Sequence, residues 1–373
     1  MPKAETLIIG AGPAGLAIAG RLASRSLPFE ILEHAGTIAN SWHNHYDRLH
    51  LHTVRKYSSL PLRPIPASYP KYISRDQLIA YCQDYTEHFS INPHFHQSAT
   101  SVKKSDGGWI VQTNDDAWES RAVVVATGIN NRPLLPGWTN EERFSGSVIH
   151  SRTYKNSKPF VDRKVLVVGM GNTGAEVALD LCENSIDVTI SLRGPVNIVP
   201  RDAFGRPSQT TGMLLDRLPN AIQDAVTKAA QRITVGNLTQ YGIETPKLSP
   251  SEQLRTLGKS PVLDLGTVAR IKSGDIKIRG EISSLSGEGV VFADGTVEWF
   301  DSIICCTGYR PALENLIPGI ASYCDEAGSP RSIIGRDDLE GLYFLGFDNY
   351  RAQGILANIN TDSKTIAEAI AGR

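Results

Sequence analysis

The sequence has few cysteines and no cysteine motif. Only five of its 373 residues are cysteines (Cys82, Cys182, Cys305, Cys306 and Cys324), and no two of them have the Cys-x-x-Cys spacing of a redox or metal site. We therefore expect five reduced, structural thiols in a cytoplasmic protein, and no metal site. A flavin disulfide reductase, which needs a redox-active cysteine pair, is correspondingly disfavoured.

The chain also lacks long apolar runs and an excess of charge of one sign. Lysine and arginine number 38 against 39 acidic residues, which gives a net charge of -1 and no basic field for a nucleic acid. No stretch approaches the roughly 20 apolar residues that span a bilayer. Residues 1–5 lack the basic and apolar regions of a signal peptide. We expect neither a nucleic-acid nor a membrane partner, and a length of 373 residues predicts two or three domains.

A glycine-rich loop near the N-terminus is the strongest positive signal. The apolar run at 7–9 leads into a Gly-x-Gly-x-x-Gly loop, a helix-prone segment at 16–24, and a second apolar run at 29–32 that ends at Glu33. Such loops turn tightly at the first glycine, admit a pyrophosphate at the second and pack the helix on the strand at the third, while the acid binds a ribose. The loop consists of Gly10, Ala11, Gly12, Pro13, Ala14 and Gly15.

A second unit of the same kind follows at 164–192. Its glycines are Gly169, Gly171 and Gly174, and a helix at 175–183 and a strand at 187–192 are expected after them. Glu33 lies 23 residues after Gly10, and the same step from Gly169 reaches Leu192, which Arg193 follows. Because a carboxylate repels a 2′-phosphate and an arginine can bind it, this site favours NADPH over NADH.

Each unit is followed by a later apolar strand that ends in Thr-Gly, at 122–128 and at 302–308. This order predicts an α/β protein with two Rossmann-like domains, the NADPH domain inserted into the FAD domain as in glutathione-reductase-like architectures. The expected FAD domain covers 1–148 and 306–373, and the NADPH domain covers 149–305, with a helical insertion at about 205–260. Within it, apolar residues from Leu214 to Ile233 recur at helical spacing, which we interpret as core or a domain cap in preference to a membrane face.

The segment between the two glycine loops resembles a family fingerprint. Phe144, Gly146, His150, Ser151 and Tyr154 match the Phe-x-Gly-x-x-x-His-Ser-x-x-Tyr pattern of flavin-containing monooxygenases at every fixed position. The stretches 46–52, 199–201, 256–267, 273–277 and 293–298 resemble the plant YUCCA branch, the indole-3-pyruvate monooxygenases. The resemblance implies FAD at the first site, NADPH at the second, and O2 as the oxidant.

The resemblance also implies roles for individual residues. For FAD we expect Gly10, Gly12, Pro13, Ala14, Gly15, Glu33, Ser41, Trp42, Thr127, Gly128 and Gln353. For NADPH we expect Gly169, Gly171, Asn172, Thr173, Gly174, Arg193, Thr307, Gly308 and Tyr309. The fingerprint residues are expected to shape the hinge between the domains.

The implied reaction is oxidation through a peroxide at the flavin C4a position, with decarboxylation of a 2-oxo acid such as indole-3-pyruvate to indole-3-acetate. A 2-oxo acid carries a carboxylate, so a cation is needed in the pocket. We expect Arg48 and His52, from the basic loop at 34–76, to supply it, with Asn172 as a third catalytic candidate. Oxygenation of a small amine or sulfide, an NADPH oxidase or quinone reductase, and a non-catalytic flavin-binding protein remain alternatives. A homodimer is left open.

Overall fold

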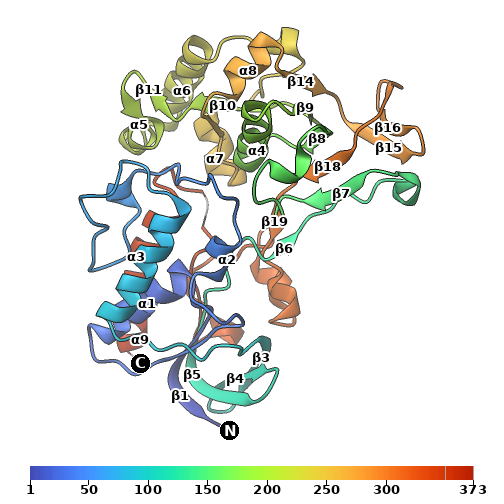
Figure 1. The fold of residues 1–373 in the computed structure, drawn as a ribbon. Helices are drawn as coiled ribbons and strands as arrows, with labels where there is room; N and C mark the ends of the chain where they lie inside the picture. Colours follow the sequence, from blue (N-terminus) through green and yellow to red (C-terminus); the bar gives the residue numbers. More distant parts are fainter. Residues whose placement is uncertain (349, 373) are drawn as a thin grey trace.

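The computed structural model describes residues 1–348 and 350–372, and its first sheet contains the N-terminal glycine loop (Figure 1). Six strands form this sheet, in the order β2-β1-β5-β4-β3, with β20 paired to the end of β5. The strands β2, β1, β5 and β20 are parallel, and β4 and β3 are antiparallel. Their bounds are β1 Lys3–Ile9, β2 Glu30–Leu32, β3 Ala99–Ser105, β4 Gly108–Thr113, β5 Ala117–Val125 and β20 Leu342–Phe344.

Three helices pack together on one part of this sheet. Helix α1 (Pro13–Ala23) contacts both α3 (Arg75–His88) and α9 (Ile355–Ala371), although these helices are far apart in the sequence. Leu16, Tyr85 and Ile366 are fully buried in their shared core. Ser74 caps α3 with a complete capping box, which explains why the helix begins there.

The second sheet contains the second glycine loop. Its five strands are all parallel and run in the order β14-β9-β8-β18-β7. Helices α4 (Asn172–Glu183) and α8 (Thr267–Ser273) contact each other beside it. The strands are β7 Ser147–His150, β8 Lys164–Val168, β9 Asp187–Ser191, β14 Ile276–Arg279 and β18 Ser302–Cys305.

Smaller elements surround the second sheet. A three-stranded antiparallel sheet precedes β18, and a mainly helical segment lies between β9 and β14. Figure 1 shows that this helical segment lies at the end of the molecule opposite both termini. Its elements are β10 Ile198–Pro200, β11 Asp202–Ala203, β12 Arg206–Pro207, α5 Ser208–Leu215, α6 Asn220–Thr234, α7 Pro250–Leu257 and β13 Val262–Asp264. The small sheet comprises β15 Ile282–Ser286, β16 Gly289–Phe292 and β17 Val297–Glu298.

The chain passes between the two sheets twice. A two-stranded ribbon of β6 (Arg132–Pro133) and β19 (Tyr309–Arg310) joins the outgoing and returning segments. After β19 the chain returns to the first sheet, where β20 pairs with β5. Both crossings therefore lie side by side, as Figure 1 shows between the lower and upper halves.

Several expectations from the sequence are confirmed, and two are wrong. Both strand–glycine loop–helix–strand units form, and the loop at 34–76 contains only the short helix α2 (Asn40–His43) and a 3-10 turn at 55–57 before α3. However, α9 begins at Ile355, whereas the sequence predicts this C-terminal helix from Thr361 to Ala371. The apolar residues at helical spacing from Leu214 to Ile233 are not core, because Leu214, Leu218, Ile222, Val226 and Ile233 are exposed.

Candidate functional site

The first glycine loop has the geometry of a phosphate cradle. Gly10 has a φ of +105°, and a Cβ there would lie 2.8 Å from the Ala126 carbonyl oxygen. A Cβ on Gly15 would lie 1.9 Å from the Gly10 carbonyl oxygen, so only glycine permits this packing of α1 on β1. A Cβ on Gly12, by contrast, would meet nothing within 4 Å. The loop therefore leaves open space at the position where a pyrophosphate would approach the helix N-terminus.

The second loop repeats this arrangement closely. Gly169 has a φ of +92°, and its Cβ would lie 2.9 Å from the Cys306 carbonyl oxygen. A Cβ on Gly174 would lie 2.0 Å from the Gly169 carbonyl oxygen, and one on Gly171 would meet nothing within 4 Å. Each loop thus packs against the strand that ends in Thr-Gly and leaves its second glycine open. The two loops fit two separate nucleotides.

The ends of the second strands differ between the two loops. Glu33, after β2, is buried and accepts hydrogen bonds from the Ala11 N–H (2.7 Å) and the Ala35 N–H (2.9 Å), and its Oε1 lies 2.8 Å from His34 Nδ1. Burial raises the pKa of Glu33, but the hydrogen bonds from His34, Ala35 and Ala11 outweigh it and lower the pKa overall. The carboxylate is therefore held ionised beside the loop.

At the corresponding point after β9, Leu192 is buried and Arg193 is exposed. Arg193 makes no ion pair within the described parts of the chain, residues 1–348 and 350–372. A free guanidinium here suits a 2′-phosphate, whereas Glu33 suits a ribose hydroxyl. The charge difference that the sequence indicated is thus present on the two strand ends.

The Thr-Gly turns border the two loops. Thr127 Oγ1 is buried without a hydrogen-bond partner among the described residues, a polar atom that a bound ligand could satisfy. Gly128 and Gly308 have positive φ, and a Cβ on either would meet nothing within 4 Å. Thr307 Oγ1 donates to the Leu134 carbonyl oxygen. The hydroxyl of Thr127 is therefore available for a ligand at the first glycine loop, whereas the hydroxyl of Thr307 already has a partner within the protein.

The fingerprint residues hold the second sheet to its neighbours. His150 Nε2 donates to the Gly308 carbonyl oxygen (3.1 Å), and its Nδ1 accepts from the Arg152 N–H, which fixes the tautomer. The His150 ring also meets the Tyr309 ring edge-on. The Ser151 N–H donates to the Cys305 carbonyl oxygen (2.9 Å). These contacts tie β7 to the turn after β18.

Two other fingerprint positions are also structural. Phe144 packs near Trp299, and a Cβ on Gly146 would lie 2.6 Å from the Phe144 ring, so the glycine makes room for that ring. Tyr154 is buried, stacks on Phe160 and donates its hydroxyl proton to Asp180 Oδ2 (2.5 Å) on α4. The segment therefore links β7 with α4, which carries the second glycine loop at its N-terminus.

The two expected substrate cations lie at a junction between the N-terminal loop and α4. Arg48 Nη1 lies 2.7 Å from Glu183 Oε2 and 3.4 Å from Asp180 Oδ1. His52 Nε2 donates to Glu176 Oε1 (2.6 Å), while its buried Nδ1 has no partner among the described residues. Both side chains are thus already paired with carboxylates of α4, which a substrate carboxylate would have to displace or join.

Glu176 is a site residue that the sequence reasoning missed. It is 2% exposed, lies one turn into α4, and hydrogen-bonds to both His52 and Tyr46. Burial and the Glu176 carboxylate raise the pKa of Tyr46, so its hydroxyl stays protonated. A buried acid two residues after the last glycine of the loop was the available signal, because such a group needs partners from another element.

His45 belongs to the same junction. Burial and the nearby charges of Lys155 and Arg75 lower the pKa of His45 to about 4, so its imidazole is neutral at pH 7. Asp47 joins the two segments further, since it lies 3.1 Å from Arg75 Nη1 and accepts from Asn156 Nδ2 (2.7 Å). The loop at 43–48 is therefore clamped between α3 and the segment after β7.

The other residues that the sequence predicts for the two cofactor sites lie on several different elements. Ser41 is exposed on α2, and Trp42 packs against the cores of both sheets. Asn172 Oδ1 accepts from the Leu263 N–H (2.7 Å), so this amide holds β13 at the start of α4, and the next residue, Thr173, is half-buried. Gln353 donates to Asn358 Oδ1 (2.7 Å).

Gln209 is a second residue that the sequence reasoning missed. Its Nε2 donates to the Gln353 carbonyl oxygen (2.5 Å), and its Oε1 accepts from the Val54 N–H (2.8 Å). It lies on α5 and is buried, so one amide joins the helical segment to the N-terminal loop and to the segment before α9.

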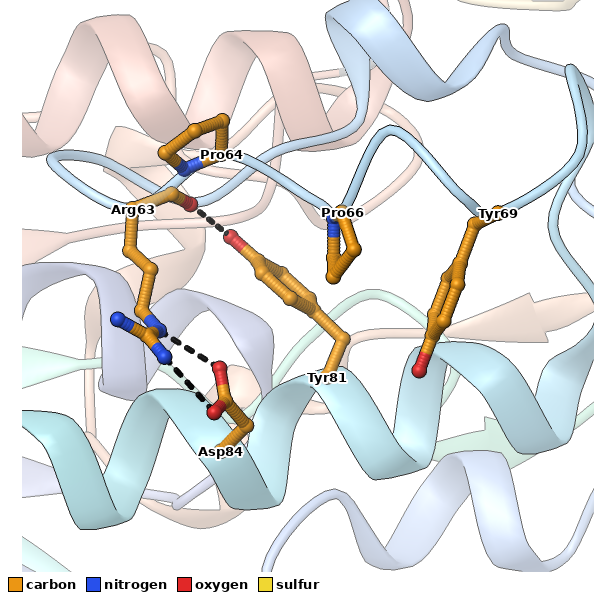
Figure 2. Close-up of a pocket in the computed structure, with 6 residues that line it drawn as sticks. All are labelled: Arg63, Pro64, Pro66, Tyr69, Tyr81 and Asp84. Atoms are coloured by element: carbon orange, nitrogen blue, oxygen red, sulfur yellow. Dashed lines mark hydrogen bonds and ion pairs between the residues drawn. The ribbon is translucent and has the colours of Figure 1, made fainter.

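Two of the surface cavities formed by residues 1–348 and 350–372 are lined by residues outside both glycine loops. One, of about 430 Å³, lies between α3 and the proline-rich loop before it, where the Arg63–Asp84 ion pair and the Tyr81 hydroxyl close one side (Figure 2). The other, of about 360 Å³, lies beside the fingerprint segment and includes Tyr154 and Phe160. The first is lined by Arg63, Pro64, Pro66, Tyr69, Tyr81 and Asp84.

Four of the five cysteines are buried, and Cys182 is half-buried. All five cysteines are free, and burial raises the pKa of Cys82 and of Cys305 to about 12, which keeps these thiols protonated. Within residues 1–348 and 350–372, no group of three or more His, Cys, Asp or Glu side chains is placed to hold a metal ion. None of the helices there is long and apolar enough to cross a membrane.

Comparison with known sequences connects this geometry to a family. A family model described as pyridine nucleotide-disulphide oxidoreductase matches residues 7–247. The chain is 37% identical over 374 residues to the indole-3-pyruvate monooxygenase YUCCA1 of Oryza sativa subsp. japonica, covering 98% of this chain and 90% of the relative. It is 38% identical over 347 residues to the probable indole-3-pyruvate monooxygenase YUCCA4 of Arabidopsis thaliana, covering 91% and 84% respectively.

Solved structures share the fold at lower identity. A flavin-containing monooxygenase from Stenotrophomonas maltophilia superimposes with a TM-score of 0.77 at 21% identity, covering 100% of this chain and 99% of that one. Cyclohexanone monooxygenase bound to epsilon-caprolactone gives a TM-score of 0.78 at 17% identity, covering 100% and 88%. A bacillithiol disulfide reductase from Staphylococcus aureus gives 0.72 at 18% identity, covering 100% and 99%. These likenesses place the chain among α/β proteins with Rossmann-type domains.

Proposed function

The chain belongs to the flavin-containing monooxygenases, in the branch of the YUCCA indole-3-pyruvate monooxygenases, and from this premise we propose the reaction and the roles of its residues. It is a flavin-dependent monooxygenase that uses FAD and NADPH. The proposed reaction converts a 2-oxo acid such as indole-3-pyruvate, with O2, NADPH and a proton, to the acid one carbon shorter, CO2, water and NADP+. The names of the relatives support this substrate.

FAD is proposed to bind at the first loop. Gly12 leaves room for its pyrophosphate, the α1 N-terminus receives the phosphates, and the ionised Glu33 receives the ribose hydroxyls. Thr127, whose buried hydroxyl lacks a partner among the described residues, is proposed to contact the same molecule. Ser41, Trp42 and Gln353 are proposed to lie toward its ring system.

NADPH is proposed to bind at the second loop. Gly171 leaves room for the pyrophosphate at the N-terminus of α4, and the exposed Arg193 is proposed to bind the 2′-phosphate. Asn172 and Thr173 are proposed to contact the nucleotide, although Asn172 must keep or exchange its bond to the Leu263 N–H. His150 and Tyr309 are proposed to hold the Thr-Gly turn that borders this site.

We also propose that the NADPH domain, residues 149–305, is inserted into a FAD domain formed by 1–148 and 306–373. The pairing of β20 with β5 supports this division, because it returns the chain to the first sheet. Residues 349 and 373, within the second FAD segment, lie outside the described residues. The five free cysteines support a reducing, cytoplasmic setting.

The chemistry of bound FAD is to accept hydride from NADPH and to activate O2, and the protein's part is to position the reactants and exclude water. The junction of Tyr46, His52 and Glu176 supplies a buried proton-holding group: His52 carries its proton on Nε2 toward Glu176. The imidazole of His45 is neutral at pH 7, so it adds no mobile proton there. The predicted binding of a substrate carboxylate by Arg48 and His52 stays a prediction, because both are paired with α4.

Gly12 and Gly171 each leave open space at the N-terminus of a helix. This repeated feature is the observation that supports two nucleotide sites in one chain. The test is to supply FAD-loaded protein with NADPH, air and indole-3-pyruvate and to measure products and hydrogen peroxide. Indole-3-acetate and CO2 formed in step with NADPH oxidation support the proposed reaction. NADPH oxidation that yields only hydrogen peroxide removes this substrate and points to amines, sulfides or an oxidase.

A further inference from the structure

Helix α6 is turned with its apolar side to the solvent. Its buried side chains are Gln223 and Gln231, which are 4% and 6% exposed. Ile222, Val226 and Ile233, by contrast, are exposed, and Ile233 reaches 72%. Because their spacings of four and seven residues place these three on one side of a helix, α6 has an apolar face that nothing in the described chain covers.

Specific polar contacts fix this orientation. Asp224 Oδ1 accepts from Ser249 Oγ (2.8 Å), and its Oδ2 pairs with Arg255 Nη2 (2.9 Å) on α7. Gln223 Nε2 donates to the Leu218 carbonyl oxygen (2.8 Å), which satisfies the buried amide. A rotation of α6 that buried the apolar face would break the two contacts of Asp224 with Ser249 and Arg255. The exposure of that face is therefore built into the packing of α6 on α7.

The apolar face extends beyond α6. Leu214 and Leu218 are exposed at the end of α5 and in the turn that follows it. Phe204, in the turn between β11 and β12, is 77% exposed. Figure 1 shows β11, α5 and α6 together at one edge of the molecule, away from the termini. We name this surface the outer face; it consists of Phe204, Leu214, Leu218, Ile222, Val226 and Ile233.

Exposed cations lie on the same elements as the outer face, or in the turns that join them. Arg206, Arg217, Lys228 and Arg232 are exposed, and none of them forms an ion pair within residues 1–348 and 350–372. The acids between positions 202 and 233 are Asp202, Asp216 and Asp224. Asp202 pairs with Lys71 and Asp224 pairs with Arg255, so Asp216 is the one acid of this range that forms no ion pair among the described residues. The surroundings of the apolar side chains are therefore positively charged, although the chain as a whole has a net charge of -1.

We propose that the outer face docks on the surface of a bilayer that contains anionic lipids. Apolar side chains flanked by lysine and arginine are the features by which a helix lies in a membrane interface. A second copy of the chain fits less well, because a two-fold contact through this face would bring the same cations together. At 15 residues α6 is about 22 Å long, so it lies on the surface and does not span it.

This proposal departs from the expectation that the chain has no membrane partner. That expectation came from the absence of a spanning run and from the interpretation of the apolar residues at 214–233 as core or a cap. The absence of a spanning run does not test for an amphipathic helix whose apolar side faces outward, and the exposure of these residues removes the second ground. The proposal requires no knowledge of the substrate, so it stands or falls apart from the proposed reaction.

The test is co-sedimentation of the FAD-loaded full chain with vesicles. One set of vesicles is pure phosphatidylcholine, and the other contains 30% phosphatidylserine. Two double variants remove the two features separately: Ile222→Ser with Ile233→Ser, and Lys228→Glu with Arg232→Glu. The matched controls change exposed residues elsewhere: Val161→Ser, and Lys103→Glu with Lys104→Glu. FAD content and NADPH oxidation verify the fold of each variant.

The expected result is binding of the unmodified protein to anionic vesicles at least about tenfold more strongly than to neutral ones. Each outer-face variant is expected to lose at least about tenfold in partitioning, while both controls stay within about twofold. Salt is expected to weaken binding, since the Debye length falls from about 10 Å at 0.1 M to about 3 Å at 1 M.

Three results would overturn the proposal. The first is no binding of the unmodified protein to anionic vesicles, and the second is binding that the outer-face variants leave unchanged. The third is a dimer in solution, measured by light scattering, that Ile222→Ser with Ile233→Ser dissociates, because the face would then belong to a second copy.

Discussion

Replacing the second glycine of each loop by alanine separates the two nucleotide sites. Gly12 and Gly171 have extended backbones, with φ of -79° and -81°, so alanine is compatible with both. An added Cβ at either position meets no atom within 4 Å, so folding is undisturbed, and a smaller unfolded-state entropy adds about 0.4–1 kcal/mol of stability. The methyl group would instead occupy the approach of a pyrophosphate, a steric penalty of about 1–3 kcal/mol.

This penalty predicts that Gly171→Ala raises the dissociation constant for NADPH by about 5- to 150-fold, with FAD content unchanged and a melting temperature that is not lowered. Gly12→Ala is expected to lower FAD affinity by a similar factor. The assay is flavin absorbance of the purified variants, followed by titration with NADPH or NADP+ under anaerobic conditions. If Gly171→Ala lost FAD and kept its NADPH affinity, or if neither variant changed either affinity, the assignment of the loops would be refuted.

Three further predictions concern the loops and the junction. Gly174→Ala places a Cβ 2.0 Å from the Gly169 carbonyl oxygen, so we expect a loss of about 1–3 kcal/mol in unfolding free energy, measured in urea; an unchanged midpoint would contradict the close packing. Burial and the charges of Lys155 and Arg75 lower the folded-state pKa of His45 to about 4, while an unfolded imidazole titrates near 6.5. Since only the unfolded chain binds this proton between those values, stability should fall by about 2 kcal/mol from pH 8 to pH 5, and His45→Gln should remove that part of the slope. Arg48→Ala should raise the KM for a 2-oxo acid about tenfold if its guanidinium receives the substrate carboxylate, and an unchanged KM would assign Arg48 to the junction with Glu183 alone.

The nucleotide loops could be predicted from the sequence because their constraints are local. A turn with φ near +100° at Gly10 and a close approach at Gly15 both require glycine, and the flanking apolar runs have the period and length of buried strands. The difference between Glu33 and Arg193 likewise depends only on the residue at the end of each strand. The spacing of the glycines and of the residue at each strand end is therefore enough to predict the two nucleotide loops.

The junction could not be predicted in the same way, because its contacts join residues more than 100 positions apart. The pairs His52–Glu176 and Arg48–Glu183 form only when the N-terminal loop lies on α4. The sequence showed the cations of the loop but not the acids that meet them, so Arg48 and His52 were interpreted as free for a substrate. Gln209 could not be predicted for the same reason, because its partners Val54 and Gln353 are also more than 100 positions away in the sequence.

The outer face shows a different limit of sequence reasoning. Helical periodicity located the apolar side of α6 correctly, but periodicity does not say whether that side faces the core or the solvent. Here the partners of the polar side, Ser249 and Arg255, decide the orientation. The period of a helix thus predicted which residues share a side, and tertiary contacts determined which side is buried.

The most direct test of the proposed reaction is isotopic. FAD-loaded protein is supplied with NADPH and indole-3-pyruvate under 18O2, and the acid product is analysed by mass spectrometry. We expect indole-3-acetate that carries one 18O atom, with one CO2 released for each NADPH oxidised. Indole-3-acetate without label, or NADPH oxidation that yields hydrogen peroxide and no acid, would contradict the proposed oxidative decarboxylation.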